Sequence, residues 1–502
     1  MKEILLGIDI GTSACKVAAF YPDGEVAAQA SESYPVYYPH PGWAEQDPEE
    51  WWTAVCRAIR SLLGQGIDAS AVKGIGIDGQ SWSAIAVDSG GKVLCRTPIW
   101  MDQRAKEICE ELKSRLGEDR LFSVSRNPVQ PMYTMPKVIW YRENQPEIYS
   151  ATYKILQSNS FIAFRLTGEI TQDPSQGYGW NCYDAEKGSW DTALCSELGV
   201  SPSLLPEIVP CHAVVGGVTE AAAEQTGLRA GTPVVAGGLD AACGTLGAGV
   251  LHPGETQEQG GQAGGMSICM DRCHADKRLI LGNHVVPGRW LLQGGTVGGG
   301  GALNWFEREF GAAERVAAQE NGTHSFYELD KAASEVPAGS EGLLFLPYLA
   351  GERSPIWDTN AKGVFYGIRF STTRAQFARA VMEGVAYSLR HNLEVAEQAG
   401  ARVGTLSAMG GAANSRLWTQ MKADVTGKPV CVPSSDTSTA LGASILAGVG
   451  TGIYSSFDDA VQSTVRIKRE FHPNPNAKIV YDEGYQRYRQ LYENLKSMMS
   501  EA

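Results

Sequence analysis

The sequence lacks long apolar runs, and this absence argues against a membrane protein. No stretch of its 502 residues approaches the ~20 consecutive apolar residues that a bilayer-spanning helix needs. The first segment reaches Asp9 too early to contain the apolar core of a secretory signal peptide. We therefore expect a cytoplasmic protein without a membrane partner.

Positive charge is in deficit, and the cysteines show no pairing pattern. The chain carries 43 basic against 56 acidic residues, a formal net charge of -13, which opposes the attraction to phosphate that nucleic-acid binders use. The eleven cysteines have no paired spacing, as expected for reduced thiols. Nucleic acid is therefore excluded from the expected partners.

Several familiar catalytic motifs are also missing. The chain contains no GxxxxGK(S/T) loop, no HExxH, no GxSxG and no CxxC pair with zinc spacing. A glycine run at 293–301 has no acidic residue at the spacing of a dinucleotide-binding fold. P-loop, zinc-protease, hydrolase and Rossmann chemistry are not supported.

Glycine, in contrast, is plentiful, and it marks two halves of similar plan. The 57 glycines cluster after apolar runs, a pattern typical of places where the backbone lies close to a ligand or to another segment. Each half opens with a glycine-bearing strand hairpin and then alternates helix and strand, including a helix predicted over 102–116. This pattern predicts two α/β domains, 1–245 and 246–502, with a tight interface.

The strongest local signal is GIDIGTSACK at 7–16. A strand places Asp9 at its end, Gly11 permits a sharp turn, and Thr12, Ser13 and Lys16 follow on the return. Such a turn is suited to hold phosphate through backbone N–H groups and hydroxyls. The alternative is an ordinary hairpin with a glycine turn.

A second signal is Asp240, which follows an apolar strand and two glycines in VVAGGLDAACGTLGAG. The glycines let a ligand approach, and the carboxylate can accept a proton from a hydroxyl. The alternative is that Asp240 only caps the helix that begins there.

Two further loops have compositions suited to ligands. The double glycine of 409–424 fits a flat ring or a ribose lying against backbone. The loop GIDGQSWSAIAVD at 76–88, with PIWMDQR at 98–104, offers aromatic surface and hydrogen-bonding groups for a polyol. Core packing is the alternative for Trp82. Together, the phosphate loops, one base and a polyol pocket indicate an ATP-dependent sugar kinase.

The chain resembles the FGGY carbohydrate kinases, and within that family the xylulokinase branch. The resemblance runs from residue 4 to about residue 450. It implies an actin-like, ribonuclease-H-like ATPase fold of two domains, with ATP and sugar in the interdomain cleft. The motifs that carry it are GIDIGTSACKVAAF at 7–20, PHPGWAEQDPEEWW at 39–52, MYTMPKVIWYREN at 132–144, FLPYLAGERSP at 345–355 and GVFYGIRFSTTRAQFARAVME at 363–383.

The resemblance also implies roles for individual residues. Asp240 matches the catalytic base, and Asp9, through water, and Asp240 match the positions that handle Mg²⁺. The positions that match sugar contacts are Gln80, Ser81, Trp82, Asp102 and Arg104. The positions that match ATP contacts are Gly11, Thr12, Ser13, Lys16, Gly261, Gln262, Gly300, Gly410, Gly411 and Asn414.

Two departures from the family pattern bear on the substrate. The sugar loop reads GQSW where xylulokinases commonly read GQMH, and the second phosphate loop reads GQAG where GTSG is usual. The expected reaction is phosphorylation of a terminal hydroxyl of a ketopentose such as D-xylulose. Another ketose, a polyol or a sugar acid is the alternative substrate. A non-catalytic actin-like ATPase switch is the alternative class of protein. The sequence does not fix the oligomeric state, and a homodimer is one option.

Overall fold

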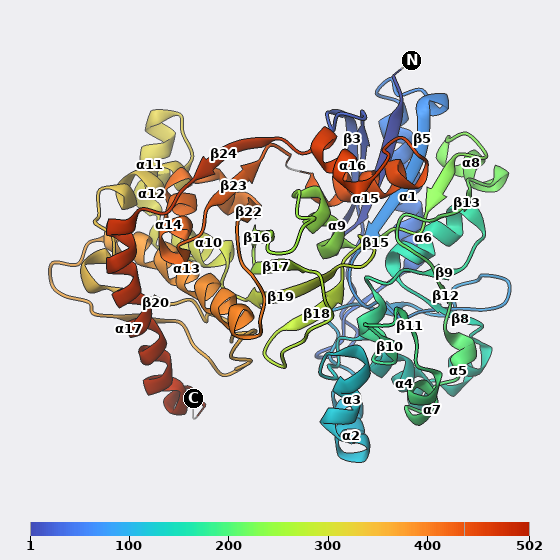
Figure 1. The fold of residues 1–502 in the computed structure, drawn as a ribbon, viewed down its shortest axis with the longest axis horizontal. Coiled ribbons are helices and arrows are strands. Elements are labelled where there is room, and N and C mark those ends of the chain that lie inside the picture. Colours follow the sequence, from blue (N-terminus) through green and yellow to red (C-terminus); the bar gives the residue numbers. More distant parts are fainter. Residues whose placement is uncertain (1, 436, 501–502) are drawn as a thin grey trace.

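The computed structural model describes residues 2–435 and 437–500, which form two lobes side by side (Figure 1). One lobe contains mostly the first half of the chain and the other mostly the second half. Each is built on a seven-stranded mixed sheet. No helix in the described ranges combines the length and apolar character needed to span a bilayer.

The first sheet begins as an antiparallel meander and continues with parallel strands. Strands β1, β2 and β3 are antiparallel neighbours, β5 and β14 extend the sheet in parallel from β1, and β13 closes the edge. Strand β15 pairs with the end of β5. The bounds are β1 Ile4–Ile10, β2 Ala14–Phe20, β3 Val26–Ser33, β5 Val72–Gly79, β13 Val214–Gly217, β14 Pro233–Val235 and β15 Gly238–Leu239.

The second sheet repeats this plan. Strands β16, β17 and β19 are antiparallel neighbours, and β22 and β23 extend the sheet in parallel from β16. Two such sheets with one plan are the arrangement expected for an actin-like fold, which is confirmed. The bounds are β16 Thr256–Gly260, β17 Gly264–Met270, β18 Ile280–Asn283, β19 Trp290–Thr296, β22 Leu406–Met409, β23 Val430–Pro433 and β24 Ile467–Phe471.

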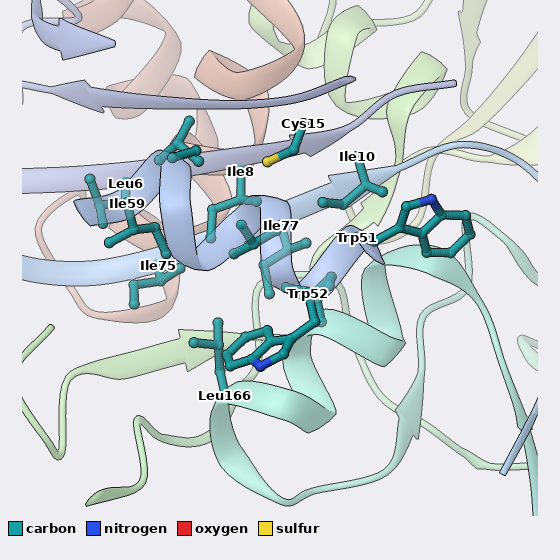
Figure 2. Close-up of a cluster of buried hydrophobic side chains, with 14 of the residues drawn as sticks. Leu6, Ile8, Ile10, Cys15, Trp51, Trp52, Ile59, Ile75, Ile77 and Leu166 are labelled. Atoms are coloured by element: carbon teal, nitrogen blue, oxygen red, sulfur yellow. The ribbon is translucent and has the colours of Figure 1, made fainter. Parts of the chain in front are cut away.

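Helix α1 (Pro48–Leu63) illustrates how local signals build the first lobe. Asp47 caps the helix by accepting a hydrogen bond from the Glu49 N–H at 2.9 Å, and Pro48 occupies the first turn. The helix packs over β2 and β3, and Trp51 and Ile59 on its apolar face are buried in one cluster with side chains of β1 and β5 (Figure 2). Burial of each such side chain stabilises the fold by about 1.5–3 kcal/mol.

The remaining longer helices cover the sheets and build the outer parts of both lobes. They are α2 Lys106–Leu116, α3 Glu118–Ser125, α4 Thr134–Asn144, α6 Ser158–Thr167, α8 Glu220–Thr226, α9 Asp240–Gly247, α10 Gly300–Phe310, α11 Ala312–Asn321, α12 Ser325–Ser334, α13 Arg374–Gln398, α14 Arg416–Thr426, α15 Ser438–Gly450, α16 Phe457–Thr464 and α17 Pro475–Ser500.

Helix α2 begins later than the sequence predicts. The sequence predicts a start at residue 102, but Asp102 lies in the loop before the helix, where its carboxylate accepts bonds from the N–H groups of Ala44 and Arg104. The side chain of Asp102 therefore competes successfully with a helical start.

Helix α15 comes from the second half of the chain but packs on the first sheet. It lies against β1, β5 and α9. In Figure 1 it is the red helix within the lobe that is otherwise mostly blue and green. Glycine makes this approach feasible, because a Cβ at Gly7 would overlap the Ala440 carbonyl and a Cβ at Gly76 would overlap that of Ala443. The predicted division at residue 245 stays a prediction.

Candidate active site

The first glycine loop joins β1 to β2 and holds the predicted phosphate residues together. Its turn is closed by a bond from the Gly11 N–H to the Ala14 carbonyl at 3.1 Å. Asp9 and Lys16 are partners across the antiparallel strands. Both line a cavity of about 370 Å³ that also contacts the start of α15. Their placement is suited to hold a phosphate and its counter-ion.

Thr12, in the same loop, is tied to two other segments. The indole N–H of Trp100 donates to the Thr12 hydroxyl at 2.9 Å, and the Gln46 amide donates to the Thr12 carbonyl at 2.8 Å. The amide of Gln80 in turn donates to Gln46 at 2.7 Å. A chain of hydrogen bonds thus links the phosphate loop to the predicted sugar loop. Ser13 is exposed beside it.

Three carboxyl groups gather where β1, β5 and β15 end. Asp78 is paired with Asp9 on neighbouring parallel strands, and β15, which precedes Asp240, pairs beside Asp78. Burial raises the pKa of Asp78 well above its usual value, and the carboxylates of Asp9 and Asp240 raise it further. Burial also raises the pKa of Asp9, while Lys16 lowers it. Sequence reasoning placed Asp78 in the polyol loop and gave it no part in binding phosphate or metal.

Asp240 is the first residue of α9 and does not cap it. The cap position belongs to Leu239, without a side-chain cap bond, and Asp240 accepts one bond from the Ala241 N–H at 2.6 Å. Asp240 remains half-buried, whereas Asp78 is fully buried. Burial, and then the Asp9 carboxylate, raise the pKa of Asp240 to about 7. A carboxylate of this kind is a better proton acceptor than an ordinary aspartate.

The backbone before Asp240 requires glycine. Gly237 has a left-handed φ of 74°, and a Cβ there would overlap the Ile77 carbonyl. A Cβ at Gly238 would stand 2.8 Å from the Ser175 hydroxyl. These glycines set Asp240 close against β5.

The second lobe contains the larger cavity, of about 610 Å³. Five of the predicted ATP residues line it, namely Gly261, Gln262, Gly300, Gly411 and Asn414. Gly410 directly precedes Gly411 and has a φ of 82°, and a Cβ there would stand 2.9 Å from the Gly260 carbonyl. The Gly301 N–H donates to the Gln262 carbonyl at 2.9 Å, which joins the GQAG loop to the start of α10.

One wall of this cavity had no counterpart among the sequence motifs. Helix α12 and the residue before it contribute His324, Phe326, Tyr327 and Asp330. Phe326 and Tyr327 are exposed aromatic side chains, and an aromatic face can stack on a nucleobase. In the sequence, the only sign of this wall is the pair of adjacent aromatic residues, Phe326 and Tyr327, at the start of a short helix.

The predicted sugar residues adopt varied environments. Gln80 and Trp82 are buried and Ser81 is half-buried. Trp82 has a left-handed φ of 57°, which is strained for a bulky residue. Its ring lies 4.8 Å from that of Tyr133 and 5.6 Å from that of Tyr178. In the described residues its indole N–H has no hydrogen-bond partner.

Asp102 and Arg104 pair with each other and with neighbouring groups. The guanidinium of Arg104 donates to Asp102 at 2.8 Å and to Glu45 at 2.7 Å, and it lies over the rings of Trp43 and Trp140. Its side chain is 2% exposed. In this geometry both residues stabilise the loop that carries Trp100.

Lys137 on α4 connects the two segments of the predicted sugar pocket. It is fully buried and donates to the carbonyls of Trp82 at 3.0 Å and Ile99 at 2.8 Å. Burial lowers the pKa of Lys137 to about 7. Sequence reasoning placed this residue in a family motif without a role.

The carboxyl cluster suits a hard cation. Both oxygens of Asp78 lack a hydrogen-bond donor among the described residues, and the half-buried Asp9 and Asp240 add carboxylate oxygens, the ligand type that Mg²⁺ prefers. Within residues 2–435 and 437–500, no three His, Cys, Asp or Glu side chains converge closely enough to hold a metal directly.

Together, the fold and the site define an actin-like ATPase-fold phosphotransferase. The N-terminal domain of the FGGY family of carbohydrate kinases matches residues 4–247, and its C-terminal domain matches residues 274–451. The chain belongs to the FGGY family of carbohydrate kinases and is a carbohydrate kinase that uses ATP.

Relatives match over nearly the whole chain. A xylulose kinase of Staphylococcus epidermidis is 32% identical over 505 residues, covering 100% of this chain and 99% of the relative. A gluconokinase of Bacillus subtilis is 31% identical over 471 residues, covering 93% and 92%. The crystal structure of xylulose kinase from Rhodospirillum rubrum has a TM-score of 0.90 at 30% identity, covering 99% and 100%.

Proposed function

We propose that this enzyme transfers the γ-phosphoryl group of ATP to the terminal hydroxyl of a ketopentose, with D-xylulose as the first candidate and D-xylulose 5-phosphate as product. The observation that carries the proposal is Asp240, a half-buried carboxylate of raised pKa that stands with Asp9 and Asp78 at the end of the first glycine hairpin. The full-length similarity to a xylulose kinase supports the choice of sugar.

In this proposal Asp240 orients the sugar hydroxyl and accepts its proton. Its second carboxylate oxygen is free to do so, since the other accepts the Ala241 N–H. Phosphoryl transfer proceeds through a loose transition state, so the enzyme contributes mainly positioning and charge neutralisation. Proton transfer to Asp240 then follows most of the bond formation to phosphorus.

The two glycine loops hold the nucleotide from opposite lobes. Thr12, Ser13 and Lys16 contact the terminal phosphates, and Gly261 and Gln262 contact them through backbone and amide N–H groups. The cavity that includes Asn414 receives the adenosine. Asp9, through water, and Asp240 would hold Mg²⁺, and the bound ion would neutralise negative charge on the phosphates of ATP.

The sugar lies against the segment 80–82. Gln80 and Ser81 offer hydrogen bonds, and the unpartnered indole N–H of Trp82 offers one more. Asp102 and Arg104 serve the sugar site by holding the loop around Trp100.

A cytoplasmic location and a homodimer complete the proposal. All eleven cysteines lie in the described residues and are unpaired, which supports a reducing compartment.

Light scattering on the purified protein tests the assembly, and two copies per particle is the expected result.

The function is tested by a coupled ADP-release screen with Mg²⁺ over ketopentoses, aldopentoses, pentitols, ketohexoses, glycerol and gluconate. D-Xylulose is expected to have the highest kcat/KM. A gluconate preference over every ketopentose by more than about tenfold, or 1.4 kcal/mol in transition-state binding, would overturn the sugar assignment.

A further inference from the structure

Arg353 is an exposed cation that reaches from the second lobe toward the first phosphate loop. Its guanidinium carbon lies 5.9 Å from the ring centre of Trp100. The indole N–H of Trp100 donates to the Thr12 hydroxyl at 2.9 Å. Since Trp100 and Thr12 belong to the first lobe, this contact joins the lobes beside the phosphate loop.

The backbone that carries Arg353 is firmly held. The carboxylate of Glu352 is 4% exposed and accepts bonds from the Thr296 hydroxyl at 2.5 Å, the Val297 N–H at 2.8 Å and the Arg353 N–H at 2.7 Å. The Ser354 hydroxyl accepts a further bond from the backbone of β19 at 2.6 Å. Arg353 therefore projects from a fixed base next to the second glycine loop, whose last residue, Gly264, pairs with Thr296 of β19.

The head of Arg353 is free to bind a ligand. In residues 2–435 and 437–500 its guanidinium takes part in no ion pair and no hydrogen bond. Arg104, in contrast, is buried and paired with Asp102 and Glu45. A guanidinium offers five N–H donors, arranged to grip phosphate oxygens in pairs.

The site also requires positive charge. Asp9, Asp78 and Asp240 stand together there, and the phosphates of ATP add further negative charge. Lys16 is the cation that stands opposite Asp9 on the first loop. A cation that arrives from the other lobe would act on the group in transit without crowding the nucleotide cavity.

We infer that Arg353 is a further catalytic residue, which binds the equatorial oxygens of the phosphoryl group in transit; this rests on the proposed kinase function. The sugar oxygen forms a bond to the γ-phosphorus, and the bond from that phosphorus to the β,γ-bridging oxygen breaks, leaving its electron pair on ADP. The hydroxyl proton passes to Asp240. Arg353 keeps its protons and stabilises charge that is greatest in the transition state.

Kinetics of three variants test this role, with D-xylulose or the best sugar of the screen as substrate. Arg353→Met should lower kcat by about 10²-fold or more, the range for removing a cation or donor from a developing charge, with little change in either KM. The kcat of Arg353→Lys should lie between those of Arg353→Met and the wild type, because an ammonium keeps the charge but not the paired hydrogen-bonding geometry. The matched control is Arg369→Met, an exposed arginine of the same lobe, whose kcat should match wild type.

Two further measurements distinguish chemistry from structure. Added guanidinium should restore part of the activity of Arg353→Ala, but not of Asp240→Asn. Calorimetry with MgADP, aluminium fluoride and sugar should give tight binding to the wild type and weaker binding to Arg353→Met, with MgADP alone bound equally. All variants should melt as wild type does; if Arg353→Met does not fold, Arg353→Lys and Arg353→Gln replace it.

The outcomes separate the two proposals. An active wild type with an equally active Arg353→Met variant overturns the inference and leaves the kinase function standing. A loss confined to KM also overturns it, because the contact would then be with the ground state. A wild type that releases no ADP with any sugar overturns the proposed function itself.

Discussion

Asp9 and Asp78 occupy paired positions on neighbouring parallel strands, so their carboxyl groups share one face of the first sheet. Asp78 is fully buried, and neither of its oxygens meets a hydrogen-bond donor in the described residues. Two carboxyl groups so placed share a proton more readily than both ionise. A bound cation would therefore favour loss of that proton and ionisation of both groups.

Replacing Asp78 by asparagine should stabilise the free enzyme. Burial raises the pKa of Asp78 well above its usual value, so the stability of the wild type falls as pH rises from about 4 toward the raised value. The Asp78→Asn variant has no carboxyl group at this position, so its stability should not fall with pH for this reason. Urea unfolding without Mg²⁺ at about pH 8 should give an unfolding free energy about 1 kcal/mol or more above wild type, with a smaller gap at about pH 5.

An exposed aspartate provides the control for that measurement. Asp271→Asn should unfold like the wild type at both pH values, since Asp271 is exposed. If Asp78→Asn is less stable than the wild type at the higher pH, the carboxyl group of Asp78 is ionised and stabilised in the fold.

Replacing Asp240 by asparagine should remove catalysis but not nucleotide binding. The amide retains the shape of the side chain but cannot accept the hydroxyl proton, so kcat should fall by about 10²-fold or more. ATP affinity, measured by calorimetry, should change little, and Asp271→Asn serves again as the control. Near-normal turnover in the variant would remove Asp240 from the mechanism.

The pH dependence of the wild type should report the same group. Burial and the Asp9 carboxylate raise the pKa of Asp240 to about 7, and only the ionised form can accept a proton. The value of kcat/KM for the sugar should therefore rise about tenfold per pH unit below about pH 7 and level off above it. A profile without this acid limb between about pH 5 and 7 would argue against an ionisable base of raised pKa.

Two substitutions at Trp82 separate packing from sugar binding. Trp82 is 8% exposed and packs edge-on against Tyr133 and Tyr178, so Trp82→Ala should cost about 3–5 kcal/mol of unfolding free energy. Trp82→Phe keeps most of the ring and loses the unpartnered N–H. It should raise the sugar KM while the ATP KM and the melting temperature stay near wild type. Unchanged sugar KM in Trp82→Phe would leave Trp82 with packing alone.

The elements predicted correctly are those whose signals act over a few residues. The β1 and β2 hairpin follows from an apolar strand, a glycine turn and a second strand, and α1 follows from the Asp47 cap and the spacing of its apolar face. The start of α2 was placed too early, because the partner of Asp102 is the N–H of Ala44, far away in the sequence.

The parts of the site that escaped prediction depend on contacts between distant segments. Nothing local indicates that Asp78 will stand beside Asp9, that Lys137 will hold the carbonyl of Trp82, or that Arg353 will approach Trp100. These contacts depend on the order of strands in the sheets and on how the lobes pack. Local sequence patterns do not predict either.

The position of α15 constrains the order in which this chain can fold during synthesis. The first sheet receives its covering helix from residues 438–450, set backbone to backbone against Gly7 and Gly76. An emerging amino-terminal lobe must therefore wait, with that face uncovered, until nearly the whole protein has left the ribosome. Unlike domains that mature one after another during translation, the two lobes reach their final state together, and a gene cut between them should yield an aggregating first fragment.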